Sequence, residues 1–169
     1  MVKKYIVGSL GMLILLFFDQ WTKHIASISL KGKPNFVIIK KIFELEYLEN
    51  RGAAFGILQN QRLLLLGITL LIFGILCVVY YRIPAKKEYI PLQAVFVVIG
   101  AGAIGNMFDR FLNGYVVDFF YVSCIDFPIF NVADCYVVVG VFVLAYLILF
   151  RYSEEELDSI WGKQKKVEE

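Results

Sequence analysis

The sequence predicts an α-helical integral membrane protein with four transmembrane helices and a small extracytoplasmic β-sheet. The first observation is composition: 59% of the 169 residues are hydrophobic and the mean hydropathy is +0.69, well above the range of soluble domains. The second is distribution, since the apolar residues form long runs instead of alternating with polar residues. The third is a stretch of strand-forming residues between the first and second runs. We expect residues 1–169 to form a single membrane domain.

The apolar runs cover residues 5–23, 63–81, 90–108 and 132–150. At a rise of ~1.5 Å per residue, a run of roughly 19 residues extends about 28 Å, which matches one hydrocarbon core. Lys3 and Lys4 before the first run are also typical of a cleaved signal peptide. We expect a retained helix instead, because this run ends in Phe-Phe-Asp-Gln-Trp, where a cleavage site requires small residues.

The short connecting segments predict the orientation in the membrane. Residues 82–87, between the second and third runs, hold three basic side chains, whereas the next connection has Arg110 alone among three aspartates. Because loops rich in Lys and Arg stay on the cytoplasmic side, we expect both termini to be cytoplasmic. Residues 24–62 and 109–131 then form outer loops, and residues 151–169 form a cytoplasmic tail.

The first outer loop and the tail carry local signals of structure. The segment "NFVIIKKIFELEYLEN", residues 35–50, is rich in β-branched and aromatic residues and predicts one or two strands of a small sheet on the outer membrane surface. The tail opens with Ser153 and Glu156 at the spacing of a capping box, which predicts a short solvated helix.

Net charge and residue types exclude several kinds of function. A formal charge of +2 is too balanced for a nucleic-acid partner, and the basic residues flank apolar runs, where they meet membrane lipids. The single histidine, His24, and the three cysteines lack the spacing of a metal site or of a nucleophilic centre. We therefore expect no metal and no cofactor.

Polar residues gather where the third run ends and the fourth begins. If the third helix leaves the membrane where the fourth enters it, six of them lie together at the outer interface: Asn106, Asp109, Arg110, Asp118, Asn131 and Asp134. Asp109 adjoins Arg110 and can pair with it. Asp118 and Asp134, in contrast, have apolar neighbours.

Asp118 and Asp134 are the candidates for catalysis. Two carboxyls that lie close together cannot both ionise readily, so they would share one proton. Hydrolysis of a peptide without a metal needs such a pair: an ionised carboxyl that activates water, and a protonated one that donates to the carbonyl oxygen. Taken alone, Asp134 can equally be a helix cap, because carboxylates are favoured at helix N-termini.

Five segments in order resemble the lipoprotein signal peptidases, the type II signal peptidases of bacteria. They are "FDQWTK" at 18–23, "NRGAAFGIL" at 50–58, "GNMFDR" at 105–110, "GYVVDFF" at 114–120 and "FNVADCYVVVG" at 130–140. The resemblance implies an aspartyl endopeptidase with four transmembrane helices and no cofactor. It would act at the extracytoplasmic face of the bacterial cytoplasmic membrane, as a monomer among membrane lipids. Its substrates would be diacylated prolipoproteins, cut before the lipidated cysteine.

The resemblance also implies roles for individual residues. The catalytic pair would be Asp118 and Asp134. Asn106, Arg110 and Asn131 match positions that line the site, and Asn50, Asp19 and Lys23 match positions near its entrance. Asp19 and Lys23 are four residues apart and can form a helical ion pair. Gly52 would let the backbone pass close to lipid or peptide.

Other classes of function stay open on the residues alone. A small transporter or ion-conducting subunit also carries polar residues inside the membrane. Transporters place such residues near the bilayer midplane, whereas here the acidic groups cluster at one interface and the second run has no charge between Arg62 and Arg82. A purely structural subunit would leave the paired asparagines and aspartates without a role.

Overall fold

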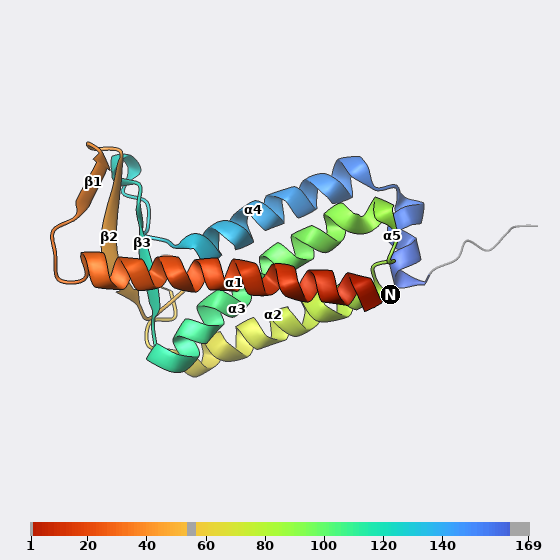
Figure 1. Ribbon diagram of the computed structural model, residues 1–169, viewed down its shortest axis with the longest axis horizontal. Coiled ribbons are helices and arrows are strands. Elements are labelled where there is room, and N and C mark those ends of the chain that lie inside the picture. The colour runs from red at the N-terminus through yellow and green to blue at the C-terminus, as the bar shows by residue number, and fades with distance from the viewer. Residues whose placement is uncertain (1, 54–56, 163–169) are drawn as a thin grey trace, which may run out of the picture.

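A computed structural model describes residues 2–53 and 57–162 and shows a bundle of helices with a small sheet at one end (Figure 1). Residues 54–56 of the segment at 50–58, and residues 163–169 of the predicted tail, lie outside the described residues. In chain order the elements are α1 (Val2–Leu30), β1 (Phe36–Ile39), β2 (Phe43–Asn50), α2 (Arg62–Arg82), η2 (Lys87–Tyr89), α3 (Ile90–Asn113), β3 (Val116–Tyr121), η3 (Ser123–Ile125), α4 (Val132–Tyr146), the π-helical η4 (Leu147–Arg151) and α5 (Glu154–Trp161).

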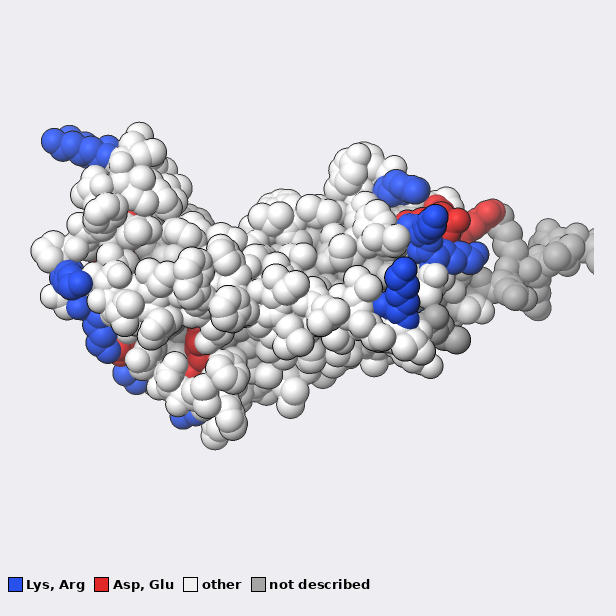
Figure 2. Space-filling view, viewed as in Figure 1, with Lys and Arg blue, Asp and Glu red and all other residues white. Residues whose placement is uncertain are grey.

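Three helical segments are long and apolar enough to cross a membrane: Arg62–Arg82, Lys87–Asn113 and Val132–Arg151. They contain the second, third and fourth predicted runs. Within the described residues α1 is not among them, so a first span at residues 5–23 stays a prediction. Figure 2 shows the charged side chains concentrated toward the two ends of the molecule, with a long uncharged surface between them. Such a surface suits hydrocarbon.

The sheet is antiparallel with strand order β1-β2-β3. The first outer loop supplies β1 and β2, as the sequence predicted. The third strand was not predicted: it comes from the loop between α3 and α4, and it pairs Val116 with Asn50 and Asp118 with Leu48. Gly114, at φ +81°, ends α3 in the left-handed conformation and turns the chain into this strand. The sheet therefore joins both outer loops.

Helix α3 packs closely on α1 and α4 through small residues. A Cβ atom added to Gly102 would lie 2.4 Å from the carbonyl oxygen of Ala133 in α4, and one added to Gly105 would lie 2.6 Å from Oδ2 of Asp19 in α1. Real Cβ atoms do not approach this closely, so these contacts require glycine. They bring the first turn of α4 and the polar part of α1 against the same stretch of α3.

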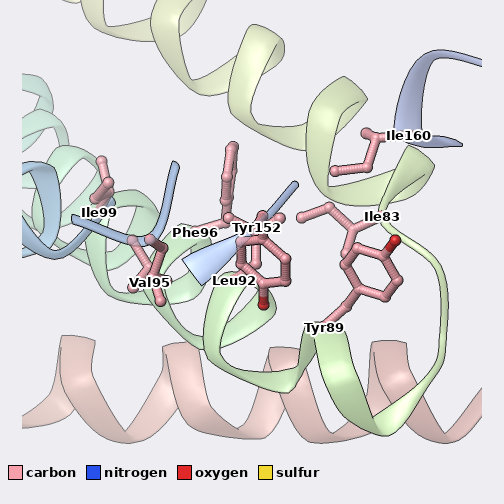
Figure 3. Packing of buried hydrophobic residues seen from close by; sticks show 9 residues of the cluster. Ile83, Tyr89, Leu92, Val95, Phe96, Ile99, Tyr152 and Ile160 are labelled. Carbon is pink, nitrogen blue, oxygen red and sulfur yellow. The ribbon is translucent and has the colours of Figure 1, made fainter. Parts of the chain in front are cut away.

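The opposite end of the bundle holds an apolar core. Ile83, Tyr89 and Tyr152 belong to this buried cluster, and Ile160 of α5 covers it (Figure 3). The rings of Tyr89 and Tyr152 stack at 5.6 Å between centroids. The predicted capping box at the start of α5 is confirmed, since the backbone N–H groups and side chains of Ser153 and Glu156 bond reciprocally.

Candidate active site

Asp118 lies in the middle of β3 and is 1% exposed. Its Oδ1 accepts a hydrogen bond from Nδ2 of Asn131 at 2.6 Å, and its Oδ2 accepts one from Nδ2 of Asn50 at 2.8 Å. Asn50 is the last residue of β2, which pairs with β3. The sheet therefore fixes both the carboxyl and one of its two donors.

Asp134 lies in the first turn of α4, and Asn131 is the N-cap of that helix. The two form a capping box: Oδ1 of Asn131 accepts from the backbone N of Asp134 at 3.1 Å, and Oδ2 of Asp134 accepts from the backbone N of Asn131 at 3.0 Å. The other oxygen of Asp134, Oδ1, accepts from Nδ2 of Asn106 at 2.8 Å. Asp134 thus caps its helix with one oxygen and faces the polar cluster with the other.

The two carboxyls are joined through Asn131. Its side chain donates to Asp118 and its backbone donates to Asp134. Burial raises the pKa of Asp118 from its usual 3.8 to about 7; the nearby charge of Asp134 contributes to the rise, and the hydrogen bonds from Asn50 and Asn131 oppose it. Asp118 therefore keeps a proton to near neutral pH while a second carboxyl lies close by. Chemically, such a pair can activate a water molecule and protonate a carbonyl oxygen.

Arg110 and Gly52 hold the loop that follows β2. Nη2 of Arg110 donates to the carbonyl oxygen of Gly52 at 2.7 Å, and the Gly52 N–H donates to Oδ1 of Asn50 at 2.9 Å. A Cβ atom added to Gly52 would lie 2.7 Å from the carbonyl oxygen of Ile57. Nε of Arg110 is buried and has no hydrogen-bond partner among the described residues. Among the described residues this N–H is therefore a donor without an acceptor.

Asp19 and Lys23 of α1, which the resemblance places near the entrance of the site, are buried. They form the predicted helical ion pair at 2.8 Å, with exposures of 0% and 3%. Nζ of Lys23 also lies 2.7 Å from Oδ2 of Asp109 and donates to Oδ1 of Asn106 at 3.0 Å. Oδ1 of Asp19 accepts from the backbone N of Ala133, in the first turn of α4, at 3.0 Å.

Asp109 pairs with Lys23 and not with its neighbour Arg110. Successive side chains on a helix point about 100° apart, so adjacent residues face different sides of α3. Sequence reasoning also missed Gln20, whose Nε2 donates to Oδ1 of Asp109 at 3.0 Å and to Oδ2 of Asp19 at 3.2 Å. A glutamine directly after Asp19, at the end of an apolar run, was the available signal for it.

The structure brings all of the predicted site residues into one connected set of hydrogen bonds and ion pairs. The members of this polar network are Asp19, Lys23, Asn50, Gly52, Asn106, Arg110, Asp118, Asn131 and Asp134. Within residues 2–53 and 57–162, no group of three or more His, Cys, Asp or Glu side chains is arranged to hold a metal ion. The chemistry that the network offers is that of two carboxyls held by amides.

The sequence comparisons agree on one family. The family described as "Signal peptidase (SPase) II" matches residues 11–150. A lipoprotein signal peptidase of Streptococcus thermophilus is 44% identical over 149 residues, covering 86% of this chain and 92% of the relative. One of Caldanaerobacter subterraneus subsp. tengcongensis is 41% identical over 138 residues, covering 81% and 92%. A solved structure described as a bacterial membrane enzyme has a TM-score of 0.73 at 31% identity, covering 95% of this chain and 93% of that chain.

Proposed function

This chain belongs to the signal peptidase II family, and on that basis we propose that it is a membrane aspartic endopeptidase that removes the signal peptide from diacylglyceryl-modified prolipoproteins. The cut falls before the lipidated cysteine. The observation that carries the proposal is the pair of Asp118 and Asp134, which Asn131 joins by hydrogen bonds. Burial raises the pKa of Asp118 to about 7, so one carboxyl of the pair can hold a proton near neutral pH. Because the family is one of peptidases, the transporter alternative has no support.

Hydrolysis at this pair needs one proton on the two carboxyls. The burial of Asp118 favours the proton there, which leaves Asp134 as the base. Asp134 takes a proton from water as the water oxygen bonds to the scissile carbonyl carbon, and Asp118 donates its proton to the carbonyl oxygen. When the resulting diol collapses, Asp134 passes its proton to the leaving nitrogen, the C–N bond breaks, and one diol hydroxyl returns its proton to Asp118 as the carbonyl re-forms. The pair ends with one proton, as it began.

The surrounding residues are suited to hold the substrate. The Nε–H of Arg110, which has no partner among the described residues, is a candidate donor to a substrate backbone carbonyl. Gly52 lets the loop after β2 fold tightly beside Asn50, because a Cβ atom there would lie 2.7 Å from the carbonyl oxygen of Ile57. Arg110 donates to the carbonyl oxygens of Gly52 and Asn106, and Asn106 in turn donates to Asp134, so a substrate bound at Arg110 would lie near the pair. We assign Asn50, Gly52 and Arg110 to substrate binding, and Asn106 and Asn131 to orienting the pair.

The proposal includes the placement of the protein in the membrane. With α1 as the first of four spans, both termini are cytoplasmic, and the sheet and the catalytic pair lie at the extracytoplasmic face of the cytoplasmic membrane. We expect a monomer. A reporter fused after Glu88 should then be cytoplasmic and one fused after Phe36 external. The opposite result would place the pair at the cytoplasmic face, away from the extracytoplasmic face where the proposed cleavage takes place. It would overturn the proposal.

The deciding experiment uses purified protein and two versions of one prolipoprotein, with a diacylated or an unmodified cysteine, at equal surface density in vesicles that contain a chelator. We expect release of the signal peptide from the diacylated version and far slower release from the other. Because both substrates are already in the membrane, the lipid acts by fixing the depth of the scissile bond against the pair. No release from either would refute the activity, and equal rates would refute the role of the lipid.

A further inference from the structure

Three asparagines aim their amide nitrogens at the catalytic pair. Asn50 donates to Asp118, Asn106 donates to Asp134, and Asn131 donates to Asp118. An asparagine amide can rotate by half a turn and present its oxygen instead, so each orientation needs a cause. The cause lies in what each amide oxygen faces.

Each oxygen faces a group that can only donate a hydrogen bond. Oδ1 of Asn131 faces the backbone N–H of Asp134 at 3.1 Å, and Oδ1 of Asn50 faces that of Gly52 at 2.9 Å. Oδ1 of Asn106 faces Nζ of Lys23 at 3.0 Å. The first two donors are backbone groups that the fold supplies. The third is a side chain, and an ammonium group has no lone pair with which to accept.

We propose that Lys23 is a positioning residue for Asp134: its ammonium group holds the amide oxygen of Asn106, and this keeps the Asn106 NH₂ group aimed at Asp134. The role rests on the proposed function of the pair. Among the described residues, Lys23 makes no hydrogen bond or ion pair with Asp134. It acts through Asn106, and it is itself held at 2.8 Å by Asp19 and at 2.7 Å by Asp109.

The consequence for catalysis follows from what Asn106 would do without Lys23. If its oxygen turned to Asp134, two acceptors would face each other, and Oδ1 of Asp134 would lose the donor that holds it in place. A carboxylate that turns away from an acceptor is no longer aimed at the water that it should activate. Nδ2 of Asn131 also approaches Oδ1 of Asn106, at 3.2 Å, but it is a neutral donor that also bonds Asp118, at 2.6 Å. A charged donor forms the stronger bond, so Lys23 sets the orientation.

The test must separate positioning from simple neutralisation of charge. Asp19, Lys23 and Asp109 together carry one formal negative charge, and the double variant Lys23→Met/Asp109→Asn has the same formal charge, on Asp19. We compare wild type, Asn106→Ala, the double variant, and the triple variant that combines all three changes. All four are assayed for kcat and KM on the diacylated substrate.

We expect the double variant to lose roughly 10- to 100-fold in kcat with little change in KM, because a misplaced catalytic group costs turnover more than binding. Asn106→Ala should lose a similar factor, and the triple variant no more than Asn106→Ala alone, since Lys23 has nothing left to position. If the two losses multiply in the triple variant, or if the double variant keeps wild-type kcat, Lys23 does not act through Asn106 and the proposal is wrong.

Lys23→Arg provides the second variant in case the charge-matched double variant unfolds. A guanidinium group is also a pure donor, so Lys23→Arg should recover most of the kcat that Lys23→Met/Asp109→Asn loses. A kcat for Lys23→Arg as low as that of Asn106→Ala, with a wild-type unfolding midpoint, would overturn the role. The turnover of wild type distinguishes the two proposals. If wild type does not cleave the substrate, the peptidase activity is refuted. If wild type cleaves it but the losses of the double variant and Asn106→Ala multiply in the triple variant, only the role of Lys23 is refuted.

Discussion

Helix α1 buries two lysines, Lys4 and Lys23, in quite different surroundings. Lys4 is 8% exposed and Lys23 3%. Nζ of Lys4 donates to the carbonyl oxygens of Tyr80, Tyr81 and Ile83, and it lies 4.6 Å from the centre of the Tyr80 ring. The ammonium of Lys23 instead meets two carboxylates and the amide oxygen of Asn106.

The difference lies in what the partners themselves touch. The carbonyls around Lys4 belong to the end of α2, where the last C=O groups of a helix lack partners and carry partial negative charge. They lead on to the apolar cluster of Figure 3, so Lys4 joins α1 to α2 and does no more. Two partners of Lys23 reach the site: Asp19 contacts α4 at its backbone, and Asn106 contacts the pair. Burial alone therefore does not distinguish Lys4 from Lys23, the lysine that we propose to position Asn106.

The largest effect on turnover should come from Asp118→Asn and Asp134→Asn. Each removes one carboxyl of the pair while keeping the shape of the side chain, and in Asp134→Asn the new amide oxygen can still accept from the backbone N of Asn131 as the helix cap requires. We expect each variant to lose at least about 10²-fold in kcat. Near-normal turnover by either variant would show that the pair is not catalytic. Unfolding midpoints close to that of wild type are the control for intact fold.

Gly105→Ala should have the next largest effect, because it disturbs the partners of Lys23 without removing any of them. The new Cβ would lie 2.6 Å from Oδ2 of Asp19, so α1 and α3 must separate or Asp19 must move. We expect a loss of about 1–3 kcal/mol in the free energy of unfolding, together with a lower kcat. Gly74→Ala is the matched control, since its Cβ would meet nothing within 4 Å. Equal behaviour of the two variants would mean that the contact at Gly105 is not tight.

Sequence reasoning recovers the parts of the fold that depend on local pattern. Three apolar runs coincide with helices able to cross a membrane, and the capping box at Ser153 and Glu156 is formed. Strand β3 was missed because its partner, β2, lies far away in the chain: Asp118 pairs with Leu48. A short strand beside a helix end has no periodicity long enough to distinguish it from a loop. Its existence is decided by the neighbour strand, which the sequence does not place.

The candidate site was predicted as a set of residues but not as a geometry. Asn106, Asn131 and the two aspartates carry their signal in the sequence, because polar residues at the ends of apolar runs are few. The partner of Asp109 was not readable in the same way. Its neighbour in sequence is Arg110, whereas its neighbour in space is Lys23, across the interface between α1 and α3. Ion pairs between helices depend on packing, which no local pattern encodes.

The dependence on pH sharpens the comparison further, because Asp118 lies in the region of Lys23 and not in that of Lys4. With its pKa raised from 3.8 to about 7, folded Asp118 holds a proton that the unfolded chain has already released. The free energy of unfolding should therefore fall as pH rises from about 4 to about 7, and kcat/KM should fall above about 7 as the pair loses its last proton. Denaturant titrations of wild type and Asp118→Asn test the first part: the same slope in both would assign it to another group.

Lys4→Met should have the smallest effect on turnover, namely none. Methionine keeps most of the length of the side chain and can pack on the Tyr80 ring, but it leaves three carbonyl oxygens without their donor, at a cost of about 1–3 kcal/mol in the free energy of unfolding. Because none of those oxygens leads to the pair, kcat and KM should equal those of wild type under conditions where both proteins are folded. Lys3→Met is the control, since Lys3 is exposed and should change neither stability nor activity. A clear loss of kcat in Lys4→Met would mean that the far end of α1 is coupled to the pair, and the two buried lysines would then differ in degree and not in kind.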